Sequence, residues 1–320
     1  MKILLNFILS LGLGLIIIPK ILIPFLKSLK IKQSVRKEGP QSHISKSGTP
    51  IMGGLYFVIV PTIIFVILDY QALLSWQGLT LIISYLGYGL IGFIDDYLIV
   101  VKHNNDGLKP SIKFLLQVLL TIGIYLLIAN HIDSVLVLPL LNIEINLGFV
   151  YPLFILVMFT ATTNGTNLSD GLDGLCAGLS IIAFSCFMVI AYLQNNELIM
   201  IFLSGVIGAL LAYLYFNKKP AKLFMGDVGS LAIGGLLASI ALLLNEEMML
   251  VYIGMIFVIE VVSVVLQVGS YKLRNGKRIF KMAPIHHHFE LCGMKEKSVV
   301  LMFWFSGLAF GVIGLLIYIF

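Results

Sequence analysis

Two adjacent carboxylates, Asp95 and Asp96, follow directly on a long apolar run of the chain. Neighbouring carboxylates at the end of such a run repel each other and lose hydration, so a bound cation is the expected compensation. The chemical interpretation makes one of them a general base and the other a contact to a cation or a substrate. The alternative is a solvated helix end without a chemical role.

A second group of polar side chains recurs at every third position between two later apolar runs: Asn164, Asn167, Asp170 and Asp173. Successive members would be neighbours on a helix, but each step drifts by about 60 degrees around the axis. The glycines among them, Gly165, Gly171 and Gly174, favour an interrupted turn that a ligand can approach closely. The pattern predicts the wall of a polar pocket, and the alternative is a purely structural turn.

Asp227 lies between Gly226 and Gly229 at the start of another apolar run. Magnesium prefers oxygen ligands, usually one or two carboxylates together with substrate phosphates and water. The amides of a helix N-terminus provide hydrogen-bond donors for an anion. We therefore predict that Asp227 is a magnesium ligand; its alternative role is an N-cap, and one residue can serve both.

Three consecutive histidines, His286, His287 and His288, stand in a basic segment. Consecutive residues do not share a helical face, so they are poorly suited to hold zinc from one helix. We interpret them as donors to phosphate or as proton-transferring groups, with a solvated histidine run as the alternative.

Three further candidates for contact with an anion are Lys46, Thr49 and Lys113. Each of them alone could instead set the topology or extend its side chain toward the membrane interface.

Glu260, Ser263 and Gln267 are spaced three and four residues apart and form one polar stripe on an otherwise apolar helix. In lipid, such a stripe usually faces protein or a water-filled cleft. Both an active-site groove and a transport path are compatible with it.

The elements that must position these residues are membrane-spanning helices. The 320 residues are 59% hydrophobic and 12% charged, and the mean hydropathy is +1.02, which excludes an ordinary soluble domain. Ten apolar stretches are each compatible with a span of roughly 20 residues. We predict an all-α, polytopic integral membrane protein with one domain over 1–320 and spans at Ile3–Phe25, Ile51–Leu68, Leu79–Ile94, Ile112–Ala129, Phe149–Thr163, Leu175–Leu193, Leu198–Phe216, Val228–Leu244, Met249–Ser270 and Val299–Ile319.

The loops after the first, third, seventh and ninth spans contain 19 of the 21 Lys and Arg residues. Cytoplasmic loops hold the positive excess, so these loops face inward and both termini face outward. The net charge of +5 therefore indicates the orientation of the chain in the membrane and not nucleic-acid binding.

In the outer segment 131–148, apolar and polar residues alternate enough to predict a small β-hairpin, with a plain connector as the alternative. Six acids fall on the outer side, and we interpret them as ordinary loop solvation: Asp69, Asp133, Glu144, Glu197, Glu246 and Glu247.

Five segments of the chain resemble, in order, those of the polyprenyl-phosphate N-acetylhexosamine-1-phosphate transferase superfamily. They are GPQSHISKSGTPIMGG (39–54), GLIGFIDDYLIVVK (89–102), NLSDGLDGL (167–175), NKKPAKLFMGDVGSLAIGG (217–235) and KRIFKMAPIHHHFE (277–290). Ser169 stands where the family pattern has Thr, and serine retains the hydroxyl group of threonine. The histidine run resembles the muramoyl-pentapeptide branch of the superfamily more than the N-acetylglucosamine-phosphate branch.

The resemblance implies a magnesium-dependent reaction in a bacterial plasma membrane, with the active site on the cytoplasmic side. UDP-N-acetylmuramoyl-pentapeptide and undecaprenyl phosphate would give lipid I and UMP for peptidoglycan synthesis. It also implies a homodimer, with membrane lipid as a further partner. The alternatives are a sister transferase that uses UDP-N-acetylglucosamine and, in a different class, an ion-coupled transporter.

The resemblance further assigns roles residue by residue. Asp227 would be the magnesium ligand, Asp95 the base on the lipid phosphate and Asp96 a supporting carboxylate. His286 and His287 are also predicted to be catalytic. The remaining predicted contacts to substrate are Lys46, Thr49, Lys113, Asn164, Asn167, Asp170, Asp173, Asn217, Phe224, Gly226, Gln267 and His288.

Overall fold

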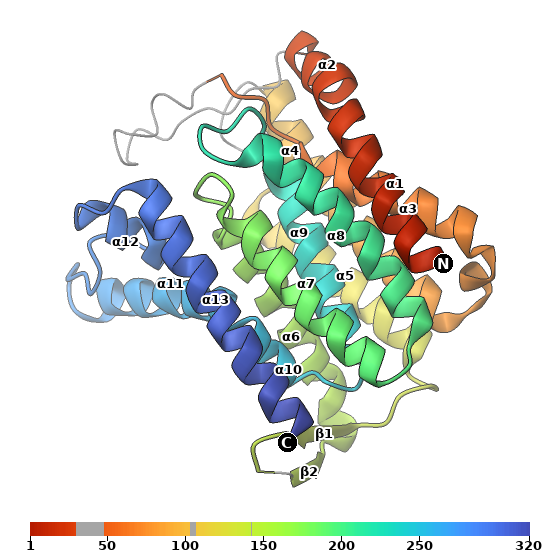
Figure 1. The fold of residues 1–320 in the computed structure, drawn as a ribbon. Helices are drawn as coiled ribbons and strands as arrows, with labels where there is room; N and C mark the ends of the chain where they lie inside the picture. The colour runs from red at the N-terminus through yellow and green to blue at the C-terminus, as the bar shows by residue number, and fades with distance from the viewer. Residues whose placement is uncertain (30–47, 103–106, 142) are drawn as a thin grey trace.

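The computed structural model describes residues 1–29, 48–102, 107–141 and 143–320. Lys46, predicted to contact substrate, lies outside these described residues. The first half of the chain contains α1 (Lys2–Ile17), η1 (Ile18–Leu22), α2 (Ile23–Ser28), α3 (Gly54–Leu68), η3 (Tyr70–Leu74), α4 (Trp76–Lys102), α5 (Pro110–Ile128), β1 (Val135–Leu138), β2 (Ile143–Asn146), η4 (Gly148–Val150) and α6 (Tyr151–Leu168). The second half contains α7 (Leu175–Leu193), α8 (Glu197–Asn217), α9 (Gly226–Leu243), α10 (Met249–Ile253), α11 (Met255–Leu273), α12 (Ile285–Leu291) and α13 (Glu296–Ile319) (Figure 1).

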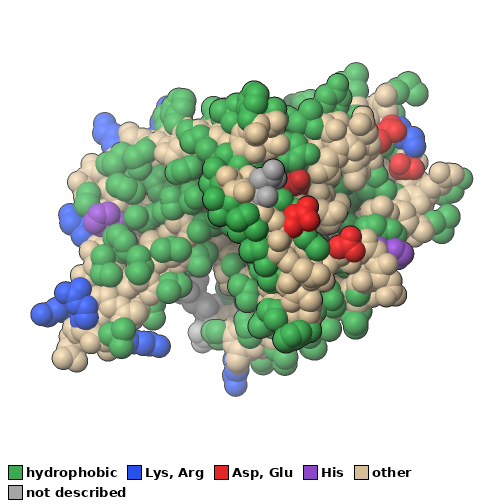
Figure 2. All heavy atoms as spheres, turned by 90° about the horizontal axis from the view of Figure 1, so that it is seen from below, with side chains coloured by type: hydrophobic (Ala, Val, Ile, Leu, Met, Phe, Trp, Pro, Cys, Tyr) green, Lys and Arg blue, Asp and Glu red, His purple; other side chains and the backbone are tan. Residues whose placement is uncertain are grey.

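The prediction of a polytopic, all-α membrane protein is confirmed. Within the described ranges, nine helical segments are long and apolar enough to cross a membrane. The remaining predicted span, Ile51–Leu68, corresponds to α3, which has only 15 residues and at 1.5 Å per residue is about 22 Å long. Figure 2 shows that hydrophobic side chains cover most of the face seen from below, while the Lys and Arg side chains visible there stand mainly at its edges.

Three predicted helix boundaries are wrong. Asp95 and Asp96 do not end their span, because α4 continues to Lys102. The predicted span Met249–Ser270 is interrupted at Gly254, where α10 ends and α11 begins. The helix α6 runs on past the predicted end at Thr163 to Leu168. Its hydroxyl groups find partners within the helix; Thr163 Oγ1, for example, donates to the carbonyl of Phe159 at 2.8 Å.

The centre of the bundle is α9. Every residue from Val228 to Leu243 is buried, and the helix packs against α4 on one side and α6 on another. In Figure 1, α9 accordingly lies behind α7 and α8 and between α4 and α6. A helix that is enclosed on all sides fixes the position of its first residues, which include Asp227.

The predicted hairpin is confirmed as β1 and β2, which pair in antiparallel register with Leu136 opposite Ile145. It lies beside the C-terminus in Figure 1.

The interpretation of Glu247 as a solvated loop residue is wrong. Its side chain is buried and its Oε1 accepts a hydrogen bond from the Tyr151 hydroxyl at 2.5 Å. Burial raises the pKa of Glu247, an effect that the hydrogen bond from Tyr151 partly offsets. Burial, reinforced by the charge of Glu247, also raises the pKa of Glu246 to about 7.

Candidate active site

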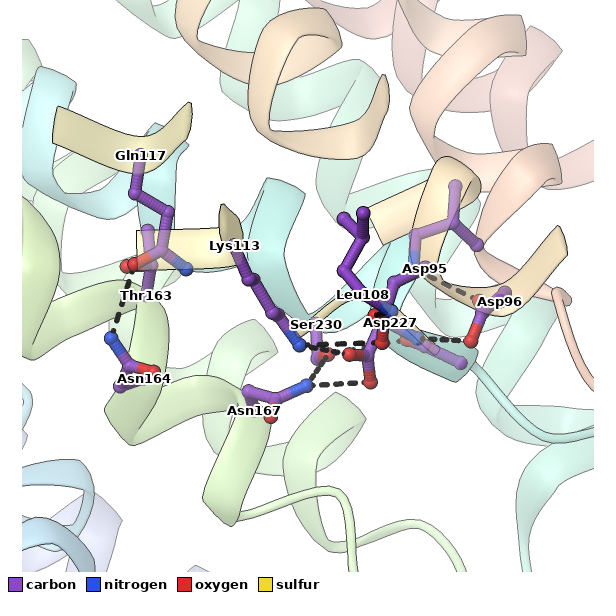
Figure 3. A network of polar contacts seen from close by, with 12 residues as sticks. Asp95, Asp96, Leu108, Lys113, Gln117, Thr163, Asn164, Asn167, Asp227 and Ser230 are labelled. Atoms are coloured by element: carbon purple, nitrogen blue, oxygen red, sulfur yellow. Dashed lines mark hydrogen bonds and ion pairs between the residues drawn. The ribbon is translucent and has the colours of Figure 1, made fainter. Parts of the chain in front are cut away.

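Four of the predicted site residues meet around the carboxylate of Asp227 at the first turn of α9 (Figure 3). Asp227 Oδ1 accepts a hydrogen bond from Asn167 Nδ2 at 2.8 Å, and its Oδ2 pairs with the ammonium group of Lys113. The same ammonium group lies 3.5 Å from Asp95 Oδ2. These residues come from α4, α5, α6 and α9, so distant parts of the chain form one cluster.

All four helices present the same end of the bundle to this cluster. Asp95 is near the C-terminal end of α4 and Lys113 is in the first turn of α5, whereas Asn167 is at the end of α6. The side chain of Asp227 remains 25% exposed, compared with 18% for Lys113 and 10% for Asp95. The cluster is therefore within reach of a ligand, and Asp227 is the most accessible of these three charged residues.

Asp96 has a different role from its neighbour. Its Oδ1 and Oδ2 each accept a backbone hydrogen bond at 3.1 Å, from the amides of Asp227 and Val228. These amides belong to the first turn of α9 and have no partner within the helix. A carboxylate at this position also interacts favourably with the helix dipole. Asp96 thus caps α9 from another helix and fixes the position of Asp227.

Two glycines allow this close approach. A Cβ at Gly92 would lie 2.1 Å from the Asp227 carbonyl oxygen, so the backbones of α4 and α9 touch there. Gly226 has a φ of +74° and a Cβ on it would lie 2.3 Å from Asp96 Oδ2. Any other residue at position 226 would be strained and would also displace the Asp96 carboxylate.

The cluster continues into the membrane-spanning part of the helices. Asn164 lies one turn before Asn167 on α6, and its Nδ2 donates to Gln117 Oε1 at 3.3 Å and to the carbonyl of Thr160 at 2.8 Å. Gln117 is one turn beyond Lys113 on α5 and is buried. Figure 3 shows this amide pair beside the carboxylate cluster. The side chain of Asn164 is therefore held between two helices.

The interrupted turn predicted for the segment 164–174 is present only in its second half, 169–174, because Asn164, Gly165 and Asn167 are still part of α6. The amide of Asp173 donates to Glu296 Oε1 at 3.0 Å, while Asp173 Oδ2 accepts from the amide of Ala221 at 3.1 Å. Asn217 Oδ1 accepts from the amide of Gly174 at 2.9 Å. Asp173 and Asn217 therefore join this turn to the loop after α8, whereas the half-buried Asp170 stands at its start.

Phe224 and Gly226 lie on the loop that leads into α9. The amide of Phe224 donates to the carbonyl of Pro50 at 2.8 Å, and its carbonyl accepts from the amide of Gly53 at 2.8 Å. This backbone pairing brings the half-buried Thr49, which precedes Pro50, to the same loop. The predicted residues of this segment are thus gathered near the start of α9.

Gln267 and His288 hold the segment between α11 and α12. Gln267 Nε2 donates to the carbonyl of Phe280 at 2.9 Å, and its Oε1 accepts from the amides of Ile279 and Phe280. His288 Nδ1 accepts from the amide of Lys281 at 3.2 Å. Both side chains bind the backbone of this segment.

His286 and His287 bind different partners, although their rings lie close together, with centroids 4.1 Å apart. His286 is completely buried, with its Nδ1 3.0 Å from Oε1 of the equally buried Glu260. Its Nε2 faces Gly171 so closely that a Cβ there would be 2.3 Å away. His287 instead pairs with Glu290 on the same short helix, α12. His286 therefore contacts the turn after α6, and through it the region of the cluster.

Three residues that contribute to the site were not assigned a role from the sequence: Gln117, Ser230 and Glu296. Ser230 Oγ accepts a hydrogen bond from Asn167 Nδ2 at 2.9 Å. A signal existed for Glu296, since it is an acid at the start of an apolar run on the inward side. No comparable signal distinguishes Gln117 or Ser230 from other polar residues of a span.

The cluster suits a divalent cation by charge and by ligand type. Within the part of the chain that the structure describes, three carboxylates, Asp95, Asp96 and Asp227, stand against the ammonium group of Lys113, a formal excess of two negative charges. Among the described residues, no group of three or more His, Cys, Asp or Glu side chains is arranged to hold a metal alone. Magnesium needs only one or two carboxylates when substrate phosphates and water complete its shell. Asp227 and Asp95 could provide them.

The fold and this cluster together define a polytopic membrane protein with an acidic, solvent-accessible site at one end of its helices. The model of glycosyl transferase family 4 matches residues 78–245, which include Asp95, Asp96, Asn167 and Asp227.

Full-length relatives resemble the chain more closely. The phospho-N-acetylmuramoyl-pentapeptide-transferase of Staphylococcus epidermidis is 49% identical over 96% of this chain and 97% of its own length. The enzymes of the same name from Staphylococcus carnosus and Staphylococcus aureus are 48% and 47% identical; the former alignment covers 94% of each chain, and the latter covers 96% of this chain and 97% of the relative. The chain belongs to glycosyl transferase family 4 and to the phospho-N-acetylmuramoyl-pentapeptide-transferases within it.

Proposed function

We propose that the protein transfers phospho-N-acetylmuramoyl-pentapeptide from its UDP-linked form to undecaprenyl phosphate, which gives lipid I and UMP. The observation that carries this proposal is the Asp95–Lys113–Asp227–Asn167 cluster within the segment that matches the family. A lipid-linked phosphate and a soluble nucleotide can meet only near a membrane interface, and this cluster lies at the ends of spanning helices.

In the proposed reaction, an oxygen of the lipid phosphate forms a bond to the sugar-linked phosphorus of the nucleotide. The bond from that phosphorus to the UMP oxygen breaks, and its electron pair leaves with UMP. Asp95 accepts the proton of the lipid phosphate where one is present, because its Oδ2 faces the centre of the cluster next to Lys113. Lys113 holds the approaching anion by charge. We favour direct displacement over an aspartyl-phosphate intermediate, since a carboxylate engaged with a cation is a poorer nucleophile.

We propose that Asp227 would hold magnesium, with phosphates of the nucleotide as its further ligands. The excess of carboxylates over cationic side chains supports this proposal. The bound ion would offset negative charge on the diphosphate and on the departing UMP. Asn167 and Asp96 serve this arrangement by fixing the side chain and the backbone of Asp227.

We propose that the cluster faces the cytoplasm and that the membrane is the plasma membrane. The inner loops hold nearly all of the lysines and arginines, which supports this orientation. The homodimer that the resemblance implies stays a prediction.

Purified protein should release UMP from UDP-N-acetylmuramoyl-pentapeptide in the presence of undecaprenyl phosphate, and not from UDP-N-acetylglucosamine. Release of UMP can be followed by chromatography with each nucleotide sugar at equal concentration. Preferential use of UDP-N-acetylglucosamine would assign the chain to the sister transferases instead. Transport is less compatible with the site, because transporter charges lie near the bilayer midplane and these carboxylates lie at helix ends.

Chelation is expected to stop the reaction. Excess EDTA should reduce UMP release to background, and added magnesium should restore it, because the ammonium group of Lys113 is already paired with Asp95 and Asp227. Calcium provides a useful comparison, since it prefers more ligands at longer distances and should restore less activity. Full activity in EDTA would contradict the assignment of a divalent cation to Asp227.

A further inference from the structure

We propose that Glu296, the first residue of α13, is a positioning residue for the nucleotide-binding part of the site. It holds the turn 169–174 against the loop after α8, so that the two segments form one surface. This inference rests on the proposed use of a UDP-linked substrate.

Glu296 contacts both segments at once. Its Oε1 accepts the backbone hydrogen bond from Asp173, and its Oε2 forms an ion pair with Lys219 of the loop. The Glu296 side chain is only 2% exposed, whereas that of Lys219 is 42% exposed. A carboxylate this well buried loses its hydration, and the amide and the ammonium group replace that hydration. Its position is therefore tightly specified by these two partners.

The two segments have little regular structure of their own to hold them. They are connected by side-chain contacts to backbone groups: Asp173 to Ala221, and Asn217 to both Gly174 and Leu223. Glu296 adds a contact from a third element, a spanning helix more than 120 residues further along the chain. Because α13 packs against α7, which begins where the turn ends, Glu296 couples the turn to a rigid part of the bundle.

The turn also follows directly on the reacting cluster. Asn167, which binds Asp227, is two residues before Ser169. A displaced turn would therefore change the surface that the UDP-linked substrate contacts. Glu296 acts on this cluster through the turn and the loop, to which its two carboxylate oxygens bind.

Glu296→Ala is expected to raise the KM for the UDP-linked substrate about tenfold, with kcat and the KM for undecaprenyl phosphate changed less than twofold. A rise in one KM alone indicates lost binding of one substrate and not general damage. Glu296→Gln retains an oxygen that can accept the Asp173 hydrogen bond and should recover most of the binding. Glu197→Ala is the matched control, because Glu197 is also the first residue of a spanning helix but is exposed.

Hydrogen exchange gives a second readout that does not depend on the substrate. Amides of 169–174 should exchange faster in Glu296→Ala than in the unsubstituted protein, Glu296→Gln or Glu197→Ala. Unchanged exchange of the amides of 169–174 in folded Glu296→Ala would overturn the positioning role. So would an equal increase in the KM values for the UDP-linked substrate and for undecaprenyl phosphate. If the unsubstituted protein releases no UMP, the proposed function fails, and the exchange experiment still decides whether Glu296 holds the turn.

Discussion

Asp227→Asn is expected to lower the rate of UMP release by about 1000-fold. This factor is at the upper end of the range of rate losses seen when one preorganised electrostatic contact is removed from an active site. The carboxylate accepts from Asn167 on one oxygen and pairs with Lys113 on the other. An asparagine side chain at position 227 has one oxygen and one NH2 group, so its NH2 group would face the Nδ2 of Asn167 or the ammonium group of Lys113, both of which are donors. The substitution would also remove the negative charge that a divalent cation requires. Both effects act on the most exposed carboxylate of the cluster.

The measurement is UMP release under saturating substrates, together with thermal unfolding of the purified variant in detergent. Asp69→Asn is the control, because Asp69 forms an ion pair with Lys2 at the far end of α3 and is not part of the cluster. It should retain nearly normal turnover. Near-normal turnover in folded Asp227→Asn would show that this carboxylate is not the metal ligand.

Asp95→Asn is expected to lower kcat by about 100- to 10,000-fold, the range for loss of a general base. The asparagine keeps an oxygen for the Leu108 amide, which now donates to Asp95 Oδ1 at 2.6 Å. Folding should therefore be largely preserved. What the substitution removes is the negative charge beside Lys113 and the ability to accept a proton.

Asp96→Asn is the informative comparison for Asp95→Asn. Asp96 accepts from two amides at the first turn of α9, and an amide side chain has only one oxygen for them. The loss of a helix cap costs about 1 kcal/mol, so the thermal unfolding temperature should fall in Asp96→Asn more than in Asp95→Asn. Equal kcat for Asp95→Asn and the unsubstituted protein would refute Asp95 as the base.

The membrane fold was largely predictable because hydrophobic length is a local property of the chain. Lipid leaves the backbone few choices other than a helix, so each long apolar run predicts one span. The errors occurred where polar residues continue a helix: Asp95 and Asp96 were taken as an end, although α4 runs on. Their carboxylates find partners in Leu108, Lys113 and the start of α9, which no local pattern reveals.

The chemical character of the site was also predictable, but the division of roles was not. Carboxylates, amides and glycines at helix ends indicated where a phosphate and a cation would bind. Adjacent Asp95 and Asp96 look equivalent in the sequence, yet one faces Lys113 and the other caps α9. Gln267 likewise matched a polar stripe, whereas its side chain binds the backbone of Phe280. Such differences depend on contacts between residues far apart in the chain.

Burial on the outer side was the least predictable feature. Glu247 resembles any acid in a polar loop, and only the fold brings the Tyr151 hydroxyl to it from 96 residues away. A loop residue next to a short helix, α10, can be enclosed by its neighbours without any apolar pattern of its own.

The backbone contact between α4 and α9 at Gly92 limits how these two helices can move relative to each other during catalysis. Since α4 and α9 touch backbone to backbone there, the helices that carry Asp95 and Asp227 move as one body. Separation of α4 from α9 would break this contact, whereas rotation of a side chain such as Lys113 leaves it intact and takes only nanoseconds. Asp95 and Asp227 are therefore expected to keep their relative position throughout the catalytic cycle.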